Sequence, residues 1–194
     1  MPWEKAFDTD EALERAADAF MAKGYEATSI THLTKGMGIN KGSLYNAFGS
    51  KKELFKEVLT KFVRDNQGPL LAQLAALDDP IAAIATLFDS VVAQGLTDSE
   101  KKGNLIINTA LEMPNHDEDV QEIVRGALDN LEQFFLVLVQ RGKDQGRIPE
   151  TIVAEDAARS LVSLTVGIRV LARGAFDGNQ MLSIKANALR LVGN

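Results

Sequence analysis

The most informative part of the chain is residues 29–48, SITHLTKGMGINKGSLYNAF. Ser29 is a favoured N-cap residue, and the apolar residues after it recur at helical spacing: Ile30, Leu33 and Met37. Gly38 then interrupts the pattern, and Asn40 can cap a second short helix. The pattern predicts a helix-turn-helix over about residues 29–48, a motif whose second helix suits the major groove of DNA.

The second short helix has one apolar and one polar side. Leu44 and Phe48 are spaced to anchor it in a core, and Gly42 leaves room for close approach of a DNA backbone. The candidate DNA-facing residues are Asn40, Lys41, Ser43, Tyr45 and Asn46. Lys51 and the free N–H groups behind Ser50 are suited to binding a phosphate.

The rest of the 194 residues also shows helical periodicity. Residues 105–113 resemble a strand in composition, but no second strand exists to pair with them, so a helix is expected. We therefore expect an all-α fold of about nine helices, with an N-terminal three-helix helix-turn-helix domain before a larger helical domain.

Composition excludes several classes of protein. The chain has no cysteine, which removes disulfides, thiolate metal sites and cysteine nucleophiles and suits a reducing cytoplasm. Charged residues or glutamine interrupt every long apolar run, and residues 1–5 lack the pattern of a signal peptide. We expect a cytoplasmic protein that does not enter the membrane.

The charge is unevenly distributed along an acidic chain with a net charge of −6. Residues 35–61 contain six lysines and two glutamates, whereas acids outnumber bases 17 to 11 in residues 68–194. A basic region on an acidic body is typical of a DNA reader with a separate second domain, although chance clustering on a solvated helix gives the same count.

The sequence of residues 8–60 resembles that of the DNA-binding domain of the TetR family. The resemblance rests on FxxxGYxxTSIxxL from Phe20 and on GINKGSLYNxFxSKxEL from Gly38. It implies a homodimeric transcriptional regulator, usually a repressor, whose larger domain binds a small effector that releases double-stranded operator DNA. The expected domains are 1–65 for DNA binding and 66–194 for ligand binding and dimerisation. Positions that match family DNA contacts are Thr28, Asn40, Lys41, Gly42, Tyr45, Asn46 and Lys51, and the neighbouring Ser29 and Ser43 are added as candidates.

The chain departs from the family wording at three positions. Thr34 and Gly36 stand where the family usually has alanine, and Gly36 should cost about 1 kcal/mol of helix propensity. Residues 102–112 resemble a TetR branch with a Gly-Cys-Leu wording, but Asn104 replaces the cysteine. Thiol-based sensing is therefore not expected here.

Two groups of residues are candidates for the functions of the second domain. A broad apolar face near the C-terminus is either a buried core or a dimer interface, and the resemblance favours the interface: Leu161, Leu164, Ile168, Leu171, Leu182, Ala186 and Leu189. Polar residues in apolar surroundings and nearby aromatic residues are candidates for an effector pocket: Phe88, Asn108, Thr109, Glu112, Phe134 and Phe135. The alternative is that the polar groups face solvent or cap neighbouring segments.

Other functions compete with DNA binding. A helical interaction module that has lost DNA binding is the main alternative, and an enzyme is disfavoured because no nucleophile stands beside a base. Residues 116–119, HDED, lack calcium-loop spacing and suit a helix N-terminus. His32 is expected to be an exposed surface residue, and neither a metal nor a cofactor is expected.

Overall fold

The computed structural model describes residues 7–193 and is helical throughout, which confirms the all-α class. Residues 1–6, which bear on the signal-peptide expectation, lie outside this range together with residue 194. The α-helices are α1 (Thr9–Lys23), α2 (Ile30–Met37), α3 (Lys41–Phe48), α4 (Lys51–Phe62), α5 (Gly68–Ala75), α6 (Pro80–Thr97), α7 (Leu105–Leu111), α8 (Glu118–Asp144), α9 (Ala154–Leu171) and α10 (Gly178–Arg190). A π-helical segment, η1 (Val63–Gln67), and a 3₁₀ segment, η2 (Met113–Asn115), complete the described elements.

The chain forms two compact units. The first unit contains the residues up to Asp65 and also Asn104–Val124, and the second contains Asn66–Gly103 with Arg125–Asn194. The expected division after residue 65 therefore coincides with a boundary, but α7, η2 and the start of α8 return to the first unit.

In the first unit, α1 packs against α2, α4 and α7, while α3 contacts α2 and α4. Side-chain caps begin three of these helices where the sequence pattern expected them. Ser29 accepts a hydrogen bond from the His32 N–H at 3.2 Å, and Asn40 accepts one from Ser43 at 2.8 Å. Ser50 likewise caps α4. Each cap satisfies a backbone donor that the helix leaves unpaired, and so fixes where the helix begins.

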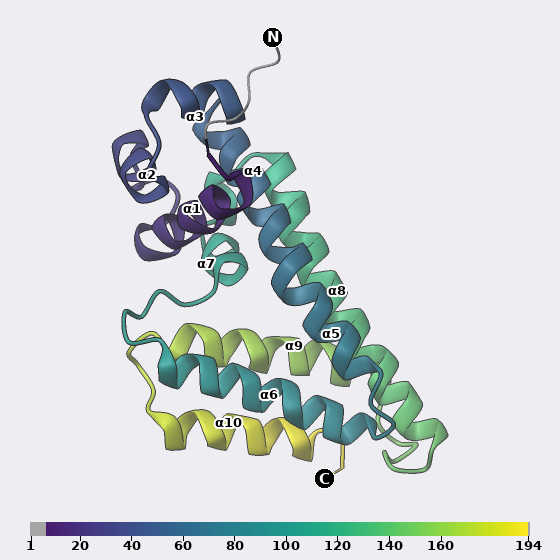
Figure 1. Ribbon diagram of the computed structural model, residues 1–194. Coiled ribbons are helices and arrows are strands. Elements are labelled where there is room, and N and C mark those ends of the chain that lie inside the picture. Colours follow the sequence, from purple (N-terminus) through teal and green to yellow (C-terminus); the bar gives the residue numbers. More distant parts are fainter. Residues whose placement is uncertain (1–6, 194) are drawn as a thin grey trace. The chain divides into compact units, whose positions relative to one another are not determined.

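In the second unit, α6, α9 and α10 lie side by side, and α5 packs on α6 (Figure 1). Their core includes Ile84, Phe88, Leu161, Ile168 and Ala188. By length and composition alone, α6 could cross a membrane, with a mean hydropathy of 1.3. Its buried face packs on three helices of this unit, as expected of a core helix.

The expected break before α5 takes the form of a π-helical turn. η1 connects α4 directly to α5, and Pro69 lies in the first turn of α5, where its missing N–H leaves no hydrogen bond unmade. The chain thus stays helical through the predicted kink.

Candidate nucleic-acid interface

The helix α3 has a sharply divided surface. Leu44 is completely buried and Phe48 is 4% exposed, whereas Tyr45 is 40% exposed and Lys41 and Asn46 are exposed. Because the two apolar residues fix the helix from the core side, its polar residues remain on the solvent side. This division matches the sequence-based expectation for a DNA-reading helix.

The turn before α3 depends on two special backbone positions. Gly38 adopts a left-handed conformation with φ 70° and ends α2. A Cβ at Gly42 would lie 3.3 Å from the Asn40 Oδ1 atom, which caps α3. Gly42 therefore makes room for the cap, and Asn40 has its Oδ1 engaged while its amide N–H groups remain available.

Two of the expected contact residues have structural roles. Thr28 is completely buried, and its hydroxyl donates a hydrogen bond to the Gly24 carbonyl at 2.6 Å. The expected contact of its side chain with DNA is therefore corrected: Thr28 fixes the loop between α1 and α2. Ser29 is exposed, but its hydroxyl oxygen caps α2 by accepting a hydrogen bond from the His32 N–H. The Ser29 N–H in turn donates to the His32 Nδ1 atom at 3.4 Å.

Lys51 is held at the start of α4. Its Nζ atom lies 4.3 Å from the centroid of the Tyr25 ring and donates to the Glu26 carbonyl at 3.4 Å. The Tyr25 ring in turn packs 4.7 Å from that of Phe55, centroid to centroid. A positive charge beside a helix N-terminus is a favourable place for a phosphate.

The six lysines of residues 35–61 fall into two groups. Lys52 pairs with Asp117 at 2.6 Å, and Lys56 pairs with Asp119 at 2.8 Å. These hydrogen bonds raise the pKa of both lysines, and the one from Lys52 lowers the pKa of Asp117. Lys61 belongs to the same paired group, described next.

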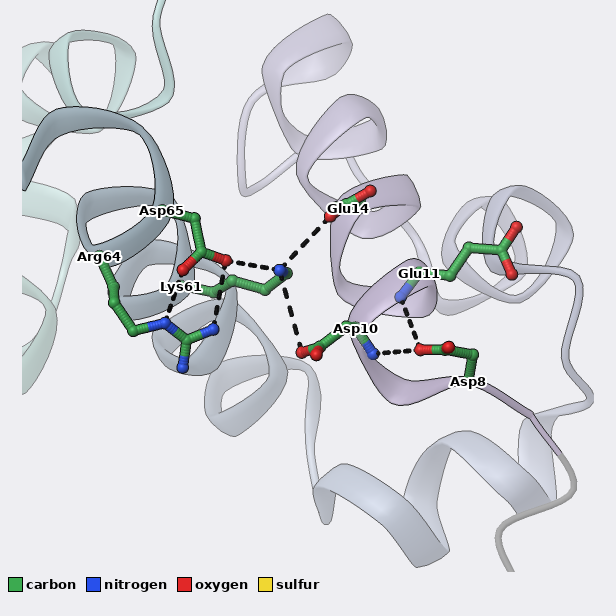
Figure 2. Close-up of polar contacts among 7 residues, drawn as sticks. All are labelled: Asp8, Asp10, Glu11, Glu14, Lys61, Arg64 and Asp65. Carbon is green, nitrogen blue, oxygen red and sulfur yellow. Dashed lines mark hydrogen bonds and ion pairs between the residues drawn. The ribbon is translucent and has the colours of Figure 1, made fainter. Parts of the chain in front are cut away.

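Figure 2 shows Lys61 between α1 and the end of α4. Its Nζ atom lies 2.6 Å from Asp65, 3.4 Å from Glu14 and 3.9 Å from Asp10. Arg64 also binds Asp65, at 2.6 Å, and the hydrogen bonds from Arg64 and then Lys61 hold the pKa of Asp65 well below its usual range. Lys61 therefore connects two helices of the first unit.

The second group, Lys35, Lys41 and Lys51, has no carboxylate within 4.0 Å among residues 7–193. The three lysines lie on α2 and at the first residues of α3 and α4, respectively. Lys35 is a candidate that the expected site left out, although the lysine count of this region had pointed to it. Among the lysines of residues 35–61, the ones without a carboxylate partner therefore lie on the elements of the predicted DNA-reading motif.

The histidine and the acidic residues of 116–119 contact lysines and aromatic rings of the first unit. Asp117 and Asp119 bind the lysines of α4, as described above. The His116 ring lies 5.3 Å from Tyr25 and 5.6 Å from Phe55. The buried Nε2 atom of His116 makes no hydrogen bond. The His116 ring therefore packs as a member of an aromatic cluster. His32 is exposed, as expected.

The expected effector residues do not form one group. Asn108, Thr109 and Glu112 lie in the first unit and line a small cavity with aromatic residues of that unit. The Thr109 hydroxyl donates to the Leu105 carbonyl within α7. Phe88, Phe134 and Phe135 instead belong to the core of the second unit. Asn104 caps α7 by accepting from the Ile107 N–H at 3.2 Å, which gives this asparagine a structural role.

The expected dimer residues are also divided. Leu161 and Ile168 are completely buried in the core of the second unit, so they are corrected to core residues. Leu164, Leu171 and Leu189 are half-buried, and Leu182 and Ala186 are exposed. Of the seven expected dimer residues, only these half-buried and exposed ones present surface that a second copy can cover.

Comparisons with known proteins agree with this architecture. The family model described as bacterial regulatory proteins, tetR family, matches residues 12–58, and that of the tetracyclin repressor-like C-terminal domain matches residues 80–182. An uncharacterized HTH-type transcriptional regulator of Bacillus subtilis (strain 168), YezE, is 33% identical over 145 residues, covering 74% of each chain. The HTH-type transcriptional repressor ComR of Escherichia coli (strain K12) is 27% identical over 195 residues, covering 96% of this chain and 90% of ComR.

A solved structure shares nearly the whole fold. It is a cysteine mutant of the TetR family transcriptional regulator CifR, complexed with 26-base-pair double-strand operator DNA. The TM-score is 0.84 at 29% identity, with 97% of this chain and 98% of the CifR chain covered. This likeness extends over both family-model matches.

Proposed function

Because this chain belongs to the tetR family of bacterial regulatory proteins and is a DNA-binding transcriptional regulator, we propose that it is a cytoplasmic, homodimeric repressor. A small-molecule effector releases it from its operator, and it has no catalytic activity of its own. The observation that carries the proposal is the division of α3 into a buried apolar side and an exposed polar side.

In this proposal α3 enters the major groove. Lys41, Ser43 and Asn46 supply hydrogen-bonding groups for base edges or the nearby backbone, and the Asn40 amide adds donors beside them. Tyr45 and Lys51 bind phosphates on either side, and Ser29 does so from the start of α2. Lys35 adds positive charge to the same surface.

The dimer follows from the need to read a palindrome. Two copies related by a twofold axis place their α3 helices in half-sites one or more helical turns apart. The half-buried and exposed apolar residues of α9 and α10 supply the shared surface: Leu164, Leu171, Leu182, Ala186 and Leu189.

Release requires that the effector bind one conformation better than another. An effector that favours a dimer whose α3 helices no longer match successive half-sites lowers operator affinity by its differential binding free energy. In this proposal the effector cavity belongs to the second unit. The expected polar residues Asn108, Thr109 and Glu112 line only a small cavity of the first unit, so they are not assigned to the effector.

The DNA-binding test is a gel shift with the full chain and the DNA upstream of its own gene. Tyr45→Ala should weaken binding to this fragment and to unrelated DNA by about the same factor, roughly tenfold, because a phosphate contact carries no sequence information. Asn46→Ala should instead reduce the preference for the specific fragment. Asn130→Ala, an exposed position on α8, is the control. Unchanged binding by the Tyr45 variant would refute the docking of α3.

The dimer test uses Leu182, which is 47% exposed on α10. Leu182→Asp should shift the protein from dimer to monomer in size-exclusion chromatography with light scattering, because a carboxylate would be buried in the interface. Val137→Asp, at a position 56% exposed on α8, should leave the dimer intact. A dimer that persists in the Leu182 variant contradicts the proposed interface.

A further inference from the structure

The Tyr25 ring, in the loop between α1 and α2, is held in place by other rings of the first unit. Three ring centroids lie 4.7–6.0 Å from its own, those of Phe55, His116 and Phe20. Phe20 and Phe55 are each 1% exposed, so they belong to the core. Side chains that pack on a close-packed core keep one arrangement on the time average. Tyr25 therefore presents a ring of fixed orientation to its remaining neighbour, Lys51.

The contact between Lys51 and the Tyr25 ring is close. The Lys51 Nζ atom lies over the ring at 4.3 Å from its centroid, whereas the Lys41 Nζ atom lies 5.8 Å from the Tyr45 centroid on α3. A cation within about 6 Å of an aromatic face is attracted by the negative potential of that face. Burial is the largest cause that raises the pKa of the Tyr25 hydroxyl, so the ring is neutral at pH 7. Lys51 is thus attracted by the ring face and not by a phenolate.

This contact leaves the Lys51 ammonium able to bind an anion. An ammonium has three N–H donors, and the Glu26 carbonyl accepts one of them at 3.4 Å. No carboxylate of residues 7–193 lies within 4.0 Å of Lys51, in contrast to Lys52, whose Nζ atom pairs with Asp117 at 2.6 Å. The ring therefore holds the charge of Lys51 in place without neutralising it.

Holding Lys51 in place before DNA arrives favours binding. Lysine is among the side chains that lose the most rotamer freedom when they are fixed. A side chain that is already held in its bound position loses less of that freedom on association, and this increases affinity. Lys51 is half-buried at the first residue of α4, where the free N–H groups of the helix also favour a phosphate.

We propose that Tyr25 is a positioning residue for DNA binding, whose ring face holds the Lys51 ammonium at the start of α4 ready for a backbone phosphate. Tyr25 acts through Lys51 and not by its own contact with DNA, and the ring carries this role without the hydroxyl. The inference rests on the proposed phosphate contact of Lys51.

The test is a double-mutant cycle with the full chain, measured by fluorescence anisotropy on the DNA upstream of its own gene. Tyr25→Leu should weaken binding roughly two- to fivefold, the factor that corresponds to an exposed cation–π contact. In the Lys51→Ala background it should weaken binding no further, because no ammonium remains to be positioned. In the Lys52→Ala background, the matched control, Tyr25→Leu should have the same effect as in the wild-type chain. The same factors should appear with unrelated DNA, since a phosphate contact carries no sequence information.

Replacements that keep a ring at position 25 make the test independent of packing, even where the leucine variant does not fold. Tyr25→Phe keeps the ring face and should bind DNA as the wild type does. Pentafluorophenylalanine at this position has nearly the shape of phenylalanine, but its fluorines reverse the potential of the ring face. It should weaken DNA binding relative to Tyr25→Phe by roughly two- to fivefold. Thermal unfolding verifies that each variant is folded at the temperature of the measurement.

The positioning role and the phosphate contact fail in different ways. Equal effects of Tyr25→Leu in the wild-type and Lys51→Ala backgrounds, or equal binding by the phenylalanine and pentafluorophenylalanine variants, would overturn the positioning role and leave the phosphate contact standing. Tighter DNA binding without the ring face would also overturn it, because the ring would then withhold Lys51 from DNA. Unchanged binding by Lys51→Ala itself would refute the proposed phosphate contact, and the positioning role with it.

Discussion

Two groups of lysines in the first unit differ in what surrounds them. Lys52, Lys56 and Lys61 pair with carboxylates at 2.6–2.8 Å. Lys35, Lys41 and Lys51 have no carboxylate within 4.0 Å in the described part of the chain. The contrast is sharpest at the consecutive residues Lys51 and Lys52, which begin α4.

This difference shows why a count of charges along the sequence is an incomplete guide to a DNA-binding surface. An ion-paired lysine gains less from a phosphate because it must give up a carboxylate, whereas an unpaired lysine only releases counterions. The surface available to DNA is therefore narrower than the basic region of the sequence, and it coincides with α2, α3 and the start of α4.

The largest effect on stability should come from the buried side of α3. Leu44→Ala should lower the free energy of unfolding by about 2–5 kcal/mol, because it leaves a cavity at a completely buried position. Tyr45→Ala, at the next residue, should change stability by about 0.5 kcal/mol or less while still weakening DNA binding. Urea unfolding measures both. Similar losses of stability would remove the distinction between the two sides of α3.

A smaller effect is expected from the paired charges shown in Figure 2. Asp65→Asn should lower the midpoint of thermal unfolding at pH 7, because the carboxylate that binds Arg64 and Lys61 is lost. The folded-state pKa of Asp65 is depressed, so its contribution is present above the ordinary aspartate pKa and fades as the pH falls below about 4. The two proteins should converge in acid. If the midpoints of the two proteins instead differed by the same amount at every pH, the lost stability would not come from the Asp65 carboxylate charge.

The smallest effect concerns Gly36, an exposed residue of α2 near α1. A Cβ there would lie 3.9 Å from the Arg15 carbonyl oxygen and 4.0 Å from the Ala19 Cβ, which are ordinary contacts. Gly36→Ala should therefore raise the free energy of unfolding by roughly 0.5–1 kcal/mol through helix propensity. DNA affinity should not change. Destabilisation in urea unfolding would mean that α2 needs glycine for a reason other than space.

Local features of the sequence predicted local features of the structure well. Ser29, Asn40 and Ser50 begin their helices because a side-chain cap acts within three residues. Leu44 and Phe48 are buried because helical spacing alone decides which side they share. The all-α class was confirmed by the helices of the structure, and the family resemblance by the two family-model matches.

Features that depend on distant partners were not predictable. Thr28 matches a DNA-contact position of the family, yet its hydroxyl turns inward to the Gly24 carbonyl. Leu161 and Leu182 are both apolar residues of the predicted dimer face, yet Leu161 is buried and Leu182 is exposed. The difference comes from packing against other helices, which periodicity does not predict. The pairing of Lys52 with Asp117 joins residues too far apart in sequence for periodicity to connect.

The salt dependence of DNA binding by Lys51→Ala and Lys52→Ala tests the division of the lysines most directly. Affinity for the upstream DNA is measured by fluorescence anisotropy over a range of salt concentrations. Lys51→Ala should reduce the slope of log affinity against log salt by about 1, since one phosphate contact is lost, and Lys52→Ala should leave it unchanged. Equal reductions in both variants, or a larger one for Lys52→Ala, would contradict this account of the DNA-binding surface.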